Sequence, residues 1–273
     1  MKIRNWNLRL GLGLLLALCL LCLLSFVYLP YPPNQMDNLH PFLRIGQTPG
    51  HLLGTDQYGR DILSRILYGS RTVLLIGFVS VASGALLGTL LGAAAAIRKG
   101  ILETLILRSI DGLLAFPGIL LALMLVAAIG KGEPAAILAI SVFTVAPFAR
   151  LSYALILEKE KLPMIKAARS FSVSRLRLLT HYYFPMLLPR LLTQFSASIA
   201  TAIMTEAALS FLGLGVQPPD ASWGLMLSEA KDYALLYPYL AAPPAVCISL
   251  SVLGFQLLGD GLNDLLLSKE QAG

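Results

Sequence analysis

Long stretches without any charged side chain are the feature that most constrains this chain. Thr72–Ile97 and Tyr233–Gly259 contain no Asp, Glu, Lys or Arg, and Leu10–Leu29 contains none either. A helix that crosses a bilayer needs about 20 mostly apolar residues. The whole chain is 56% hydrophobic and only 13% charged, whereas about 25% of the residues of a soluble domain are charged. The sequence therefore predicts an all-α, multi-pass membrane protein.

Hydropathy predicts six transmembrane helices. In the second, Gly84, Gly88 and Gly92 form a row of small residues that lets another helix approach closely. Pro117 should kink the third, and Pro147 interrupts the fourth. The six expected spans are Leu10–Leu29, Thr72–Ile97, Gly112–Gly130, Pro134–Tyr153, Leu191–Leu214 and Tyr233–Gly259.

The distribution of basic residues predicts the orientation in the membrane. If the N-terminus is cytoplasmic, most of the 21 Lys and Arg residues fall in inner segments, as the positive-inside rule requires. Six spans then leave both termini in the cytoplasm. Because these basic residues lie between apolar runs, the net charge of +6 indicates membrane topology, and nucleic-acid binding is not expected.

The segment MIKAARSFSVSRLRLLTHYYFP, residues 164–185, lies between the fourth and fifth spans and carries a compact basic cluster. Helical spacing predicts an amphipathic cytoplasmic helix over about residues 163–180, with Pro163 in its first turn. Such a helix could lie on lipid headgroups or in a groove of a soluble partner. Its apolar stripe is expected to hold Ile165, Ala168, Ser172, Leu176, Leu179 and Tyr183.

No set of residues predicts chemistry by this chain. It has no glycine-rich phosphate-binding motif followed by Lys and Ser or Thr, so it is not expected to hold ATP. Cys19 and Cys22 are interpreted as apolar residues of the first span. His40 and His51 are assigned to the opposite side of the membrane from His181, which argues against a shared metal site. We therefore expect no enzyme activity, no cofactor and no metal.

Two groups of charged residues remain as candidates. Glu206 lies in the fifth apolar run, with Ser210 one turn later. It could line the translocation path or its gate, or it could be a structural group at the outer end, wet or hydrogen-bonded to the backbone of the following turn. The second group is Asp56, Arg60, Asp61 and Arg65, for which the prediction is a solvated outer helix face with Asp–Arg pairs.

Four stretches carry a resemblance to a known family. The central segment resembles the cytoplasmic loop signature of binding-protein-dependent ABC importer permeases: Ala167, Ala168 and Pro185 match, while Lys166 and Ser172 stand where that signature has Glu and Gly. HLLGTDQYGRDILSRILYGSRT (residues 51–72), TEAALSFLGLGVQPPDASWGLML (residues 205–227) and the closing GFQLLGDGLNDLL are similar to the peptide/nickel branch of these permeases, in particular the dipeptide and oligopeptide "C" subunits.

This resemblance, which covers essentially the whole chain, implies a type I ABC importer permease in a bacterial inner membrane. It implies alternating access driven by two cytoplasmic ATPase subunits, a second homologous permease subunit and an extracytoplasmic binding protein. The cargo would be peptides, nickel or a metal chelate. Residues 1–71 would form an N-terminal helix with an extracytoplasmic segment, and residues 72–273 the permease core. The resemblance makes the central helix a coupling helix, with ATPase contacts expected at Lys166, Ala167, Ala168, Arg169, Ser172 and Val173. The competing hypothesis is a stand-alone channel or secondary carrier.

Overall fold

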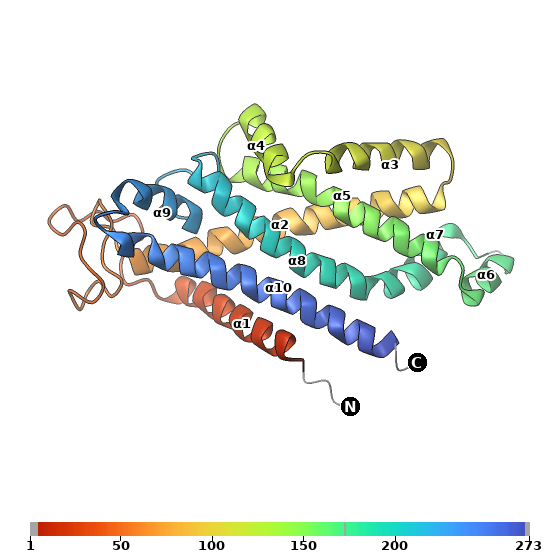
Figure 1. Cartoon of the computed structure of the whole chain (residues 1–273), viewed down its shortest axis with the longest axis horizontal. Coiled ribbons are helices and arrows are strands. Elements are labelled where there is room, and N and C mark those ends of the chain that lie inside the picture. The colour runs from red at the N-terminus through yellow and green to blue at the C-terminus, as the bar shows by residue number, and fades with distance from the viewer. Residues whose placement is uncertain (1–4, 172, 271–273) are drawn as a thin grey trace.

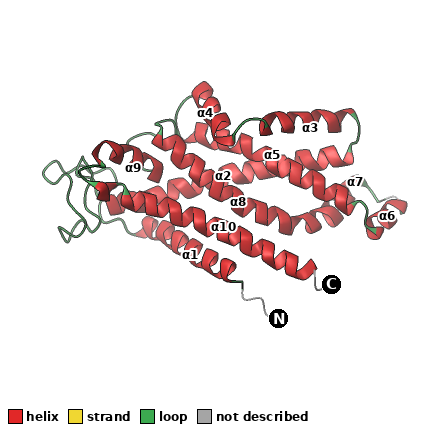
Figure 2. Ribbon diagram, in the orientation of Figure 1, coloured by secondary structure: helices red, strands yellow, loops and turns green. Residues whose placement is uncertain are grey.

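The computed structural model describes residues 5–171 and 173–270, and this part of the chain is a bundle of helices joined by loops (Figure 1, Figure 2). The β pairing within it is limited to an isolated bridge between Thr55 and Asp61. The α-helices are α1 (Trp6–Val27), α2 (Ile62–Ile97), α3 (Ile101–Leu114), α4 (Gly118–Ile129), α5 (Glu133–Lys159), α6 (Pro163–Ser170), α7 (Arg175–Arg177), α8 (Phe184–Phe211), α9 (Trp223–Ala230) and α10 (Ala242–Glu270). A π-helical segment, η1 (Leu178–Tyr183), joins α7 to α8, and two 3-10 turns, η2 (Lys231–Tyr233) and η3 (Pro238–Leu240), precede α10.

The number of spans agrees with the prediction if α3 and α4 count as one broken span. Five helical stretches in the described residues are long and apolar enough to cross a membrane, and the α3–α4 pair, bent by 93°, is the sixth candidate. The single third span expected at Gly112–Gly130 is wrong. Pro117 does more than kink it, because α3 ends at Leu114 and Pro117 caps the start of α4. With 12 residues, α4 is about 18 Å long, too short to cross the hydrocarbon core alone.

Several helix boundaries differ from the predicted spans for local reasons. α2 begins at Ile62 rather than Thr72, because the Asp61 carboxylate accepts the backbone N–H of Ser64 and caps the helix. The predicted boundary between the N-terminal part (residues 1–71) and the permease core (residues 72–273) therefore falls inside α2. α5 continues through Pro147 to Lys159.

The bundle has two distinct ends (Figure 1). The loop of residues 28–61 and the short helix α9 lie at one end, which we call the outer end. α6 and α7 lie at the opposite, inner end, and the described ends of α1 and α10 point toward it. The described ends of α1 and α10 thus lie on the same side of the bundle as the central basic segment, whereas the cytoplasmic orientation of that side remains a prediction.

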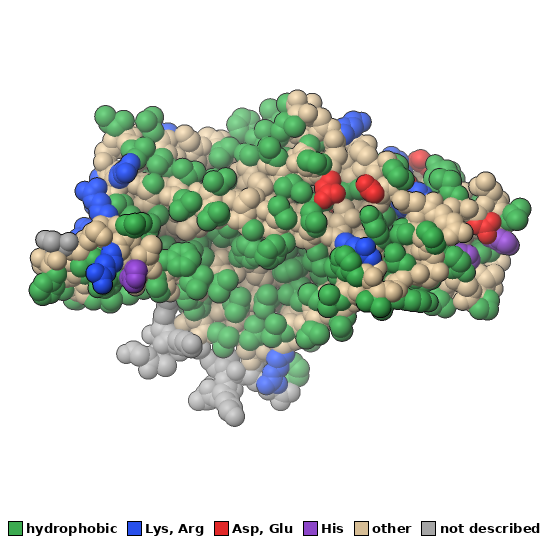
Figure 3. Space-filling model, turned by 180° about the vertical axis from the view of Figure 1, so that it is seen from behind, with side chains coloured by type: hydrophobic (Ala, Val, Ile, Leu, Met, Phe, Trp, Pro, Cys, Tyr) green, Lys and Arg blue, Asp and Glu red, His purple; other side chains and the backbone are tan. Residues whose placement is uncertain are grey.

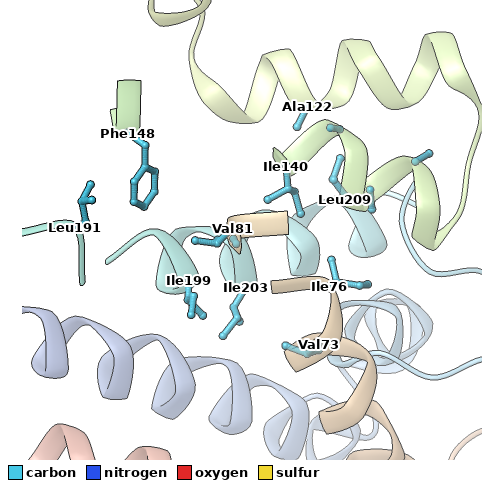
Figure 4. Close-up of a cluster of buried hydrophobic side chains, with 14 of the residues drawn as sticks. Val73, Ile76, Val81, Ala122, Ile140, Phe148, Leu191, Ile199, Ile203 and Leu209 are labelled. Atoms are coloured by element: carbon cyan, nitrogen blue, oxygen red, sulfur yellow. The ribbon is translucent and has the colours of Figure 1, made fainter. Parts of the chain in front are cut away.

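The core is formed mainly by α2, α5 and α8 (Figure 4). Ile76 of α2, Ile140 of α5 and Ile203 of α8 are fully buried there. The glycine row of α2 faces α5: a Cβ at Gly88 would collide with the carbonyl oxygen of Val145, and Gly84 and Gly92 meet the α5 backbone in the same way. The predicted close helix approach is confirmed.

The prediction of a solvated outer helix face at residues 56–65 is wrong. Arg65 is only 1% exposed, and Arg60, Asp56 and Asp61 are also buried. The reason is a partner far away in the sequence: Glu229 of α9 lies 2.8 Å from Nη2 of Arg60 and 3.3 Å from Nη2 of Arg65. Asp56 holds Arg60 from the other side, at 2.6 Å.

This buried charge network joins the outer loop to α2 and α9. Arg65 also donates to the carbonyl of Pro33 and to the side chain of Asn34, at 3.3 and 3.2 Å. Beside it, the indole N–H of Trp223 donates to the carbonyl of Ile66, at 3.1 Å. Every charged side chain of the network has an oppositely charged partner, which is the condition for keeping charges out of water, although Nε of Arg65 lies 4.0 Å from Asp56 and makes no hydrogen bond within the described residues. The outer loop is therefore fixed to the bundle.

Candidate coupling site

The central basic segment forms a short helix followed by a break. α6 begins at Pro163, as predicted, and ends at Ser170 after eight residues. The single helix expected over residues 163–180 is therefore wrong. Phe171 is the C-cap of α6, and Ser174 caps a new helical start by accepting the backbone N–H of Arg177. From Arg175 the chain stays helical through η1 and α8 to Phe211.

The break divides the predicted apolar stripe. Ile165 and Ala168 face inward and are buried, as expected, but Leu176 lies beyond the break and is 72% exposed. The outward side of α6 carries different residues. Met164 and Phe171 are exposed, with side chains 48% and 84% accessible, and Ala167 between them is exposed as well.

We call Met164, Ala167 and Phe171 the outward face of α6. They are three and four residues apart, and Phe171 is the C-cap residue that directly follows the helix, so the three lie on one side of α6. Sequence analysis predicted contacts at Ala167 but overlooked Met164 and Phe171, although this spacing was present in the sequence. An exposed row of apolar side chains at the tip of a membrane protein indicates a contact surface.

α6 is held to the ends of two membrane helices through Glu160. One oxygen of its carboxylate lies 2.5 Å from Nη2 of Arg169 on α6, and the other lies 3.6 Å from Nζ of Lys99 after α2. Burial is the largest single influence on the pKa of Arg169 and acts to lower it, but the hydrogen bond and the negative charge of Glu160, with a smaller contribution from Tyr183, together raise that pKa above its ordinary value. Arg169 thus stays charged, and the ion pair fixes α6 to the end of α5.

The predicted coupling residues have different environments. Lys166 and Ala167 are exposed, Ala168 is buried, and Arg169 is half-exposed in its ion pair. Val173 is partly buried, and its N–H donates to the carbonyl of Ala168, at 3.3 Å. Ser172 lies outside the described residues. The ATPase contacts of all six residues remain a prediction.

Glu206 and Ser210 form a second, separate site near the outer end. Glu206 is fully buried, and its carboxylate accepts the hydroxyl of Ser210, at 2.7 Å. The Ser210 oxygen in turn accepts the backbone N–H of Val216, at 3.0 Å. The wet environment considered for Glu206 is therefore wrong, and its link to the backbone after the turn runs through Ser210. A role in the gate remains a prediction.

One helical stretch connects the two sites. Arg175–Phe211 comprises 37 residues and is about 55 Å long at 1.5 Å per residue. Its first turn adjoins the α6 region, and its last turn holds Glu206 and Ser210. A displacement of α6 could therefore be carried along α8 to the outer end, since packed helices move as rigid elements.

The surface suits a membrane environment. Hydrophobic side chains cover most of the middle of the face seen in Figure 3, and Lys and Arg side chains gather toward the end that carries α6. Exposed apolar residues run along α1 and α2, for example Leu16, Phe78 and Leu86. This pattern matches an apolar belt with a basic inner end.

Comparisons with known proteins identify the family. Residues 84–270 match the model of the binding-protein-dependent transport system inner membrane component. The glutathione transport system permease protein GsiD of Pectobacterium atrosepticum is 41% identical over 236 residues, which cover 86% of this chain and 78% of that protein. A putative peptide transport system permease protein of Brucella abortus is 37% identical over 265 residues, covering 96% and 88% of the two chains.

The fold has a solved counterpart. In an inward-facing structure of the MetNI methionine ABC transporter, a chain aligns with 71% of this chain and 93% of its own length, at a TM-score of 0.59 and 19% identity. The likeness shows that the helices are arranged as in a type I ABC importer permease. With the family match over most of its length and relatives above one third identity, this chain belongs to the inner membrane permease subunits of binding-protein-dependent ABC importers.

Proposed function

We propose that this permease carries short peptides, including glutathione-like peptides, into the cell, with both termini and α6 on the cytoplasmic side. The proposal rests on the similarity to a glutathione permease and to a putative peptide permease over most of the chain. Nickel or a metal chelate, which the sequence left open, has no comparable support from these relatives.

The energy for transport is proposed to enter through the outward face of α6. An ATPase subunit would receive Met164, Ala167 and Phe171 in a hydrophobic groove, which is a common way to bind a short helix. The Glu160 ion pairs would transmit its motion to α2 and α5, and α8 would carry it outward. ATP would be bound and hydrolysed by two such partner subunits. A second permease subunit would complete the pathway, and a binding protein would deliver the peptide at the outer end.

A substitution on the outward face tests the coupling role. Ala167→Arg places a long charged side chain on this exposed face and should abolish the stimulation of ATP hydrolysis by the peptide-loaded binding protein in reconstituted transporter. Thr104→Arg is the matched control, since Thr104 is exposed on α3 at the same end of the bundle. It should leave the stimulation intact.

The outcomes separate the hypotheses. Normal stimulation in Ala167→Arg would contradict the docking role. Peptide flux through the reconstituted chain alone, without ATP, would support the stand-alone carrier instead. The cargo is tested separately by identifying the ligand that copurifies with the partner binding protein: a bound metal chelate without peptide would refute the peptide assignment and leave the coupling role untouched.

A further inference from the structure

A basic cleft lies at the inner end of the bundle, behind α6. Its volume is about 620 Å³, and it opens between the ends of α2 and α5 and the start of α7. Four cationic side chains and one carboxylate line it, together with a buried tyrosine: Arg98, Lys99, Arg169, Arg175, Glu160 and Tyr183. The cleft therefore has an excess of positive charge, which suits an anionic ligand.

Two of the four cations are available for a ligand. Glu160 already pairs with Lys99 and Arg169, whereas no ion pair among the described residues engages Arg98 or Arg175. Tyr183 is 1% exposed and forms part of the inner wall. Its hydroxyl lies close to Arg169 but makes no hydrogen bond of good geometry within the described part of the chain.

An apolar groove lies between α2 and α8. It has a volume of about 270 Å³ and is lined by side chains of α2 and α8 that include Leu86, Leu90, Leu188 and Leu192. The linings of the two hollows are neighbours along the chain. Leu178 lines the cleft and Leu179 the groove, and on α2 Ile97 of the cleft lies about one turn from Ala93 of the groove.

The dimensions of this combined site match one leaflet of a bilayer. From Ala85, at the far end of the groove, to Ile97, at the cleft, α2 rises by about 18 Å. One leaflet contributes about half of a hydrocarbon core that is about 30 Å thick. A ligand that fills both hollows must be anionic at one end and apolar over roughly that length.

We propose that the cleft and groove bind an anionic phospholipid of the inner leaflet, with its phosphate between Arg98 and Arg175 and an acyl chain along Leu90 and Leu188. Guanidinium groups match phosphate oxygens in geometry and charge. Basic pockets between membrane helices on the cytoplasmic side are suited to acidic headgroups. Because Arg169 of α6 also lines the cleft, the bound lipid would contact the coupling segment directly.

The test compares lipid binding by the full-length chain in the assembled transporter. The transporter is purified in detergent and titrated with phosphatidylglycerol, with phosphatidylcholine or with inorganic phosphate, and retained ligand is counted by native mass spectrometry. Wild type should retain phosphatidylglycerol in preference to phosphatidylcholine. Arg98→Gln with Arg175→Gln should weaken this binding about thirtyfold, at roughly 1 kcal/mol for each basic residue and tenfold for each 1.4 kcal/mol.

Two further variants make the result specific. Arg108→Gln with Arg177→Gln removes the same charge from exposed positions outside the cleft and should bind phosphatidylglycerol as wild type does. Leu90→Trp fills the groove without changing charge and should also reduce retention.

Other occupants give different results. Inorganic phosphate that displaces phosphatidylglycerol at equal concentration would assign the cleft to a free anion and overturn the lipid site. Equal binding by all variants would also overturn it. Absence of lipid, together with a cross-link from Leu188→Cys to the second permease subunit, would show that a protein covers the groove.

Discussion

Glu229→Gln is the substitution that most sharply tests the buried network at the outer end. Glu229 is the shared anion of two arginines, Arg60 at 2.8 Å and Arg65 at 3.3 Å. The side chains of these arginines are 4% and 1% exposed. Removing one partner of a buried ion pair costs 3–5 kcal/mol as a rule. We expect the lower end, about 3 kcal/mol, because Arg60 keeps Asp56 at 2.6 Å and Arg65 keeps two neutral oxygen acceptors.

The assay is reversible unfolding of the purified protein in mixed micelles, with the free energy of unfolding compared between variants. Asp232→Asn removes a carboxylate from an exposed position at the same end of the molecule. It should change stability by less than about 0.5 kcal/mol. Arg65→Met combined with Glu229→Met should recover part of the loss, since apolar pairs can replace buried ion pairs. Equal stability of Glu229→Gln and Asp232→Asn would refute the buried network.

Three other predictions follow from particular contacts. Gly88→Leu should destabilise the protein by about 1–3 kcal/mol or more, because the new side chain meets the α5 backbone. Gly13→Leu is the control and should not destabilise it, because Gly13 faces open space. Equal yields of folded protein from the two variants would contradict the close approach of α2 and α5. Glu206→Gln should keep the fold, since the new carbonyl can still accept the Ser210 hydroxyl, but lower peptide uptake; unchanged uptake would assign Glu206 a packing role alone. The hydrogen bond from His40 lowers the pKa of Asp37, so the folded loop favours the ionised carboxylate. The stability that this carboxylate adds to the loop is present at pH values above the ordinary carboxyl pKa, and it is lost as the pH falls through the lowered pKa of Asp37. In Asp37→Asn, the protection of the outer loop against hydrogen exchange should no longer fall at acidic pH. If the protection of the variant depends on pH as that of the wild type does, this role of Asp37 is contradicted.

The sequence predicted the parts of the fold that depend on local pattern. The apolar runs located α1 to within four residues at each end. They also found α2 and α10, but the predicted start of α2 was ten residues late, and the predicted start and end of α10 were nine and eleven residues early. The glycine row of α2 predicted a close helix contact, which α5 makes. Pro163 correctly predicted the start of α6. These features follow from hydropathy, from residue size and from the backbone preference of proline, all of which act within a few residues.

The features that sequence reasoning missed depend on distant residues or on the path of the backbone. Residues 56–65 appear as charged surface in the sequence because their partner, Glu229, is 169 residues from Arg60. The break after Ser170 was missed because the apolar spacing continues through it to Leu176, although Ser174 offers a cap for a new helix. That break moves the exposed contact surface from the expected stripe to the outward face of α6.

The most direct test of the coupling account is site-specific photo-cross-linking from α6 in the assembled transporter. Photoreactive residues placed at Met164, Ala167 and Phe171 should cross-link to an ATPase subunit, because these side chains face outward. The same residue at Ile165, which is fully buried within the chain, should give no such product. Cross-links from the outward face to lipid alone while the ATPase is bound, or ATPase cross-links from Ile165 alone, would contradict the account.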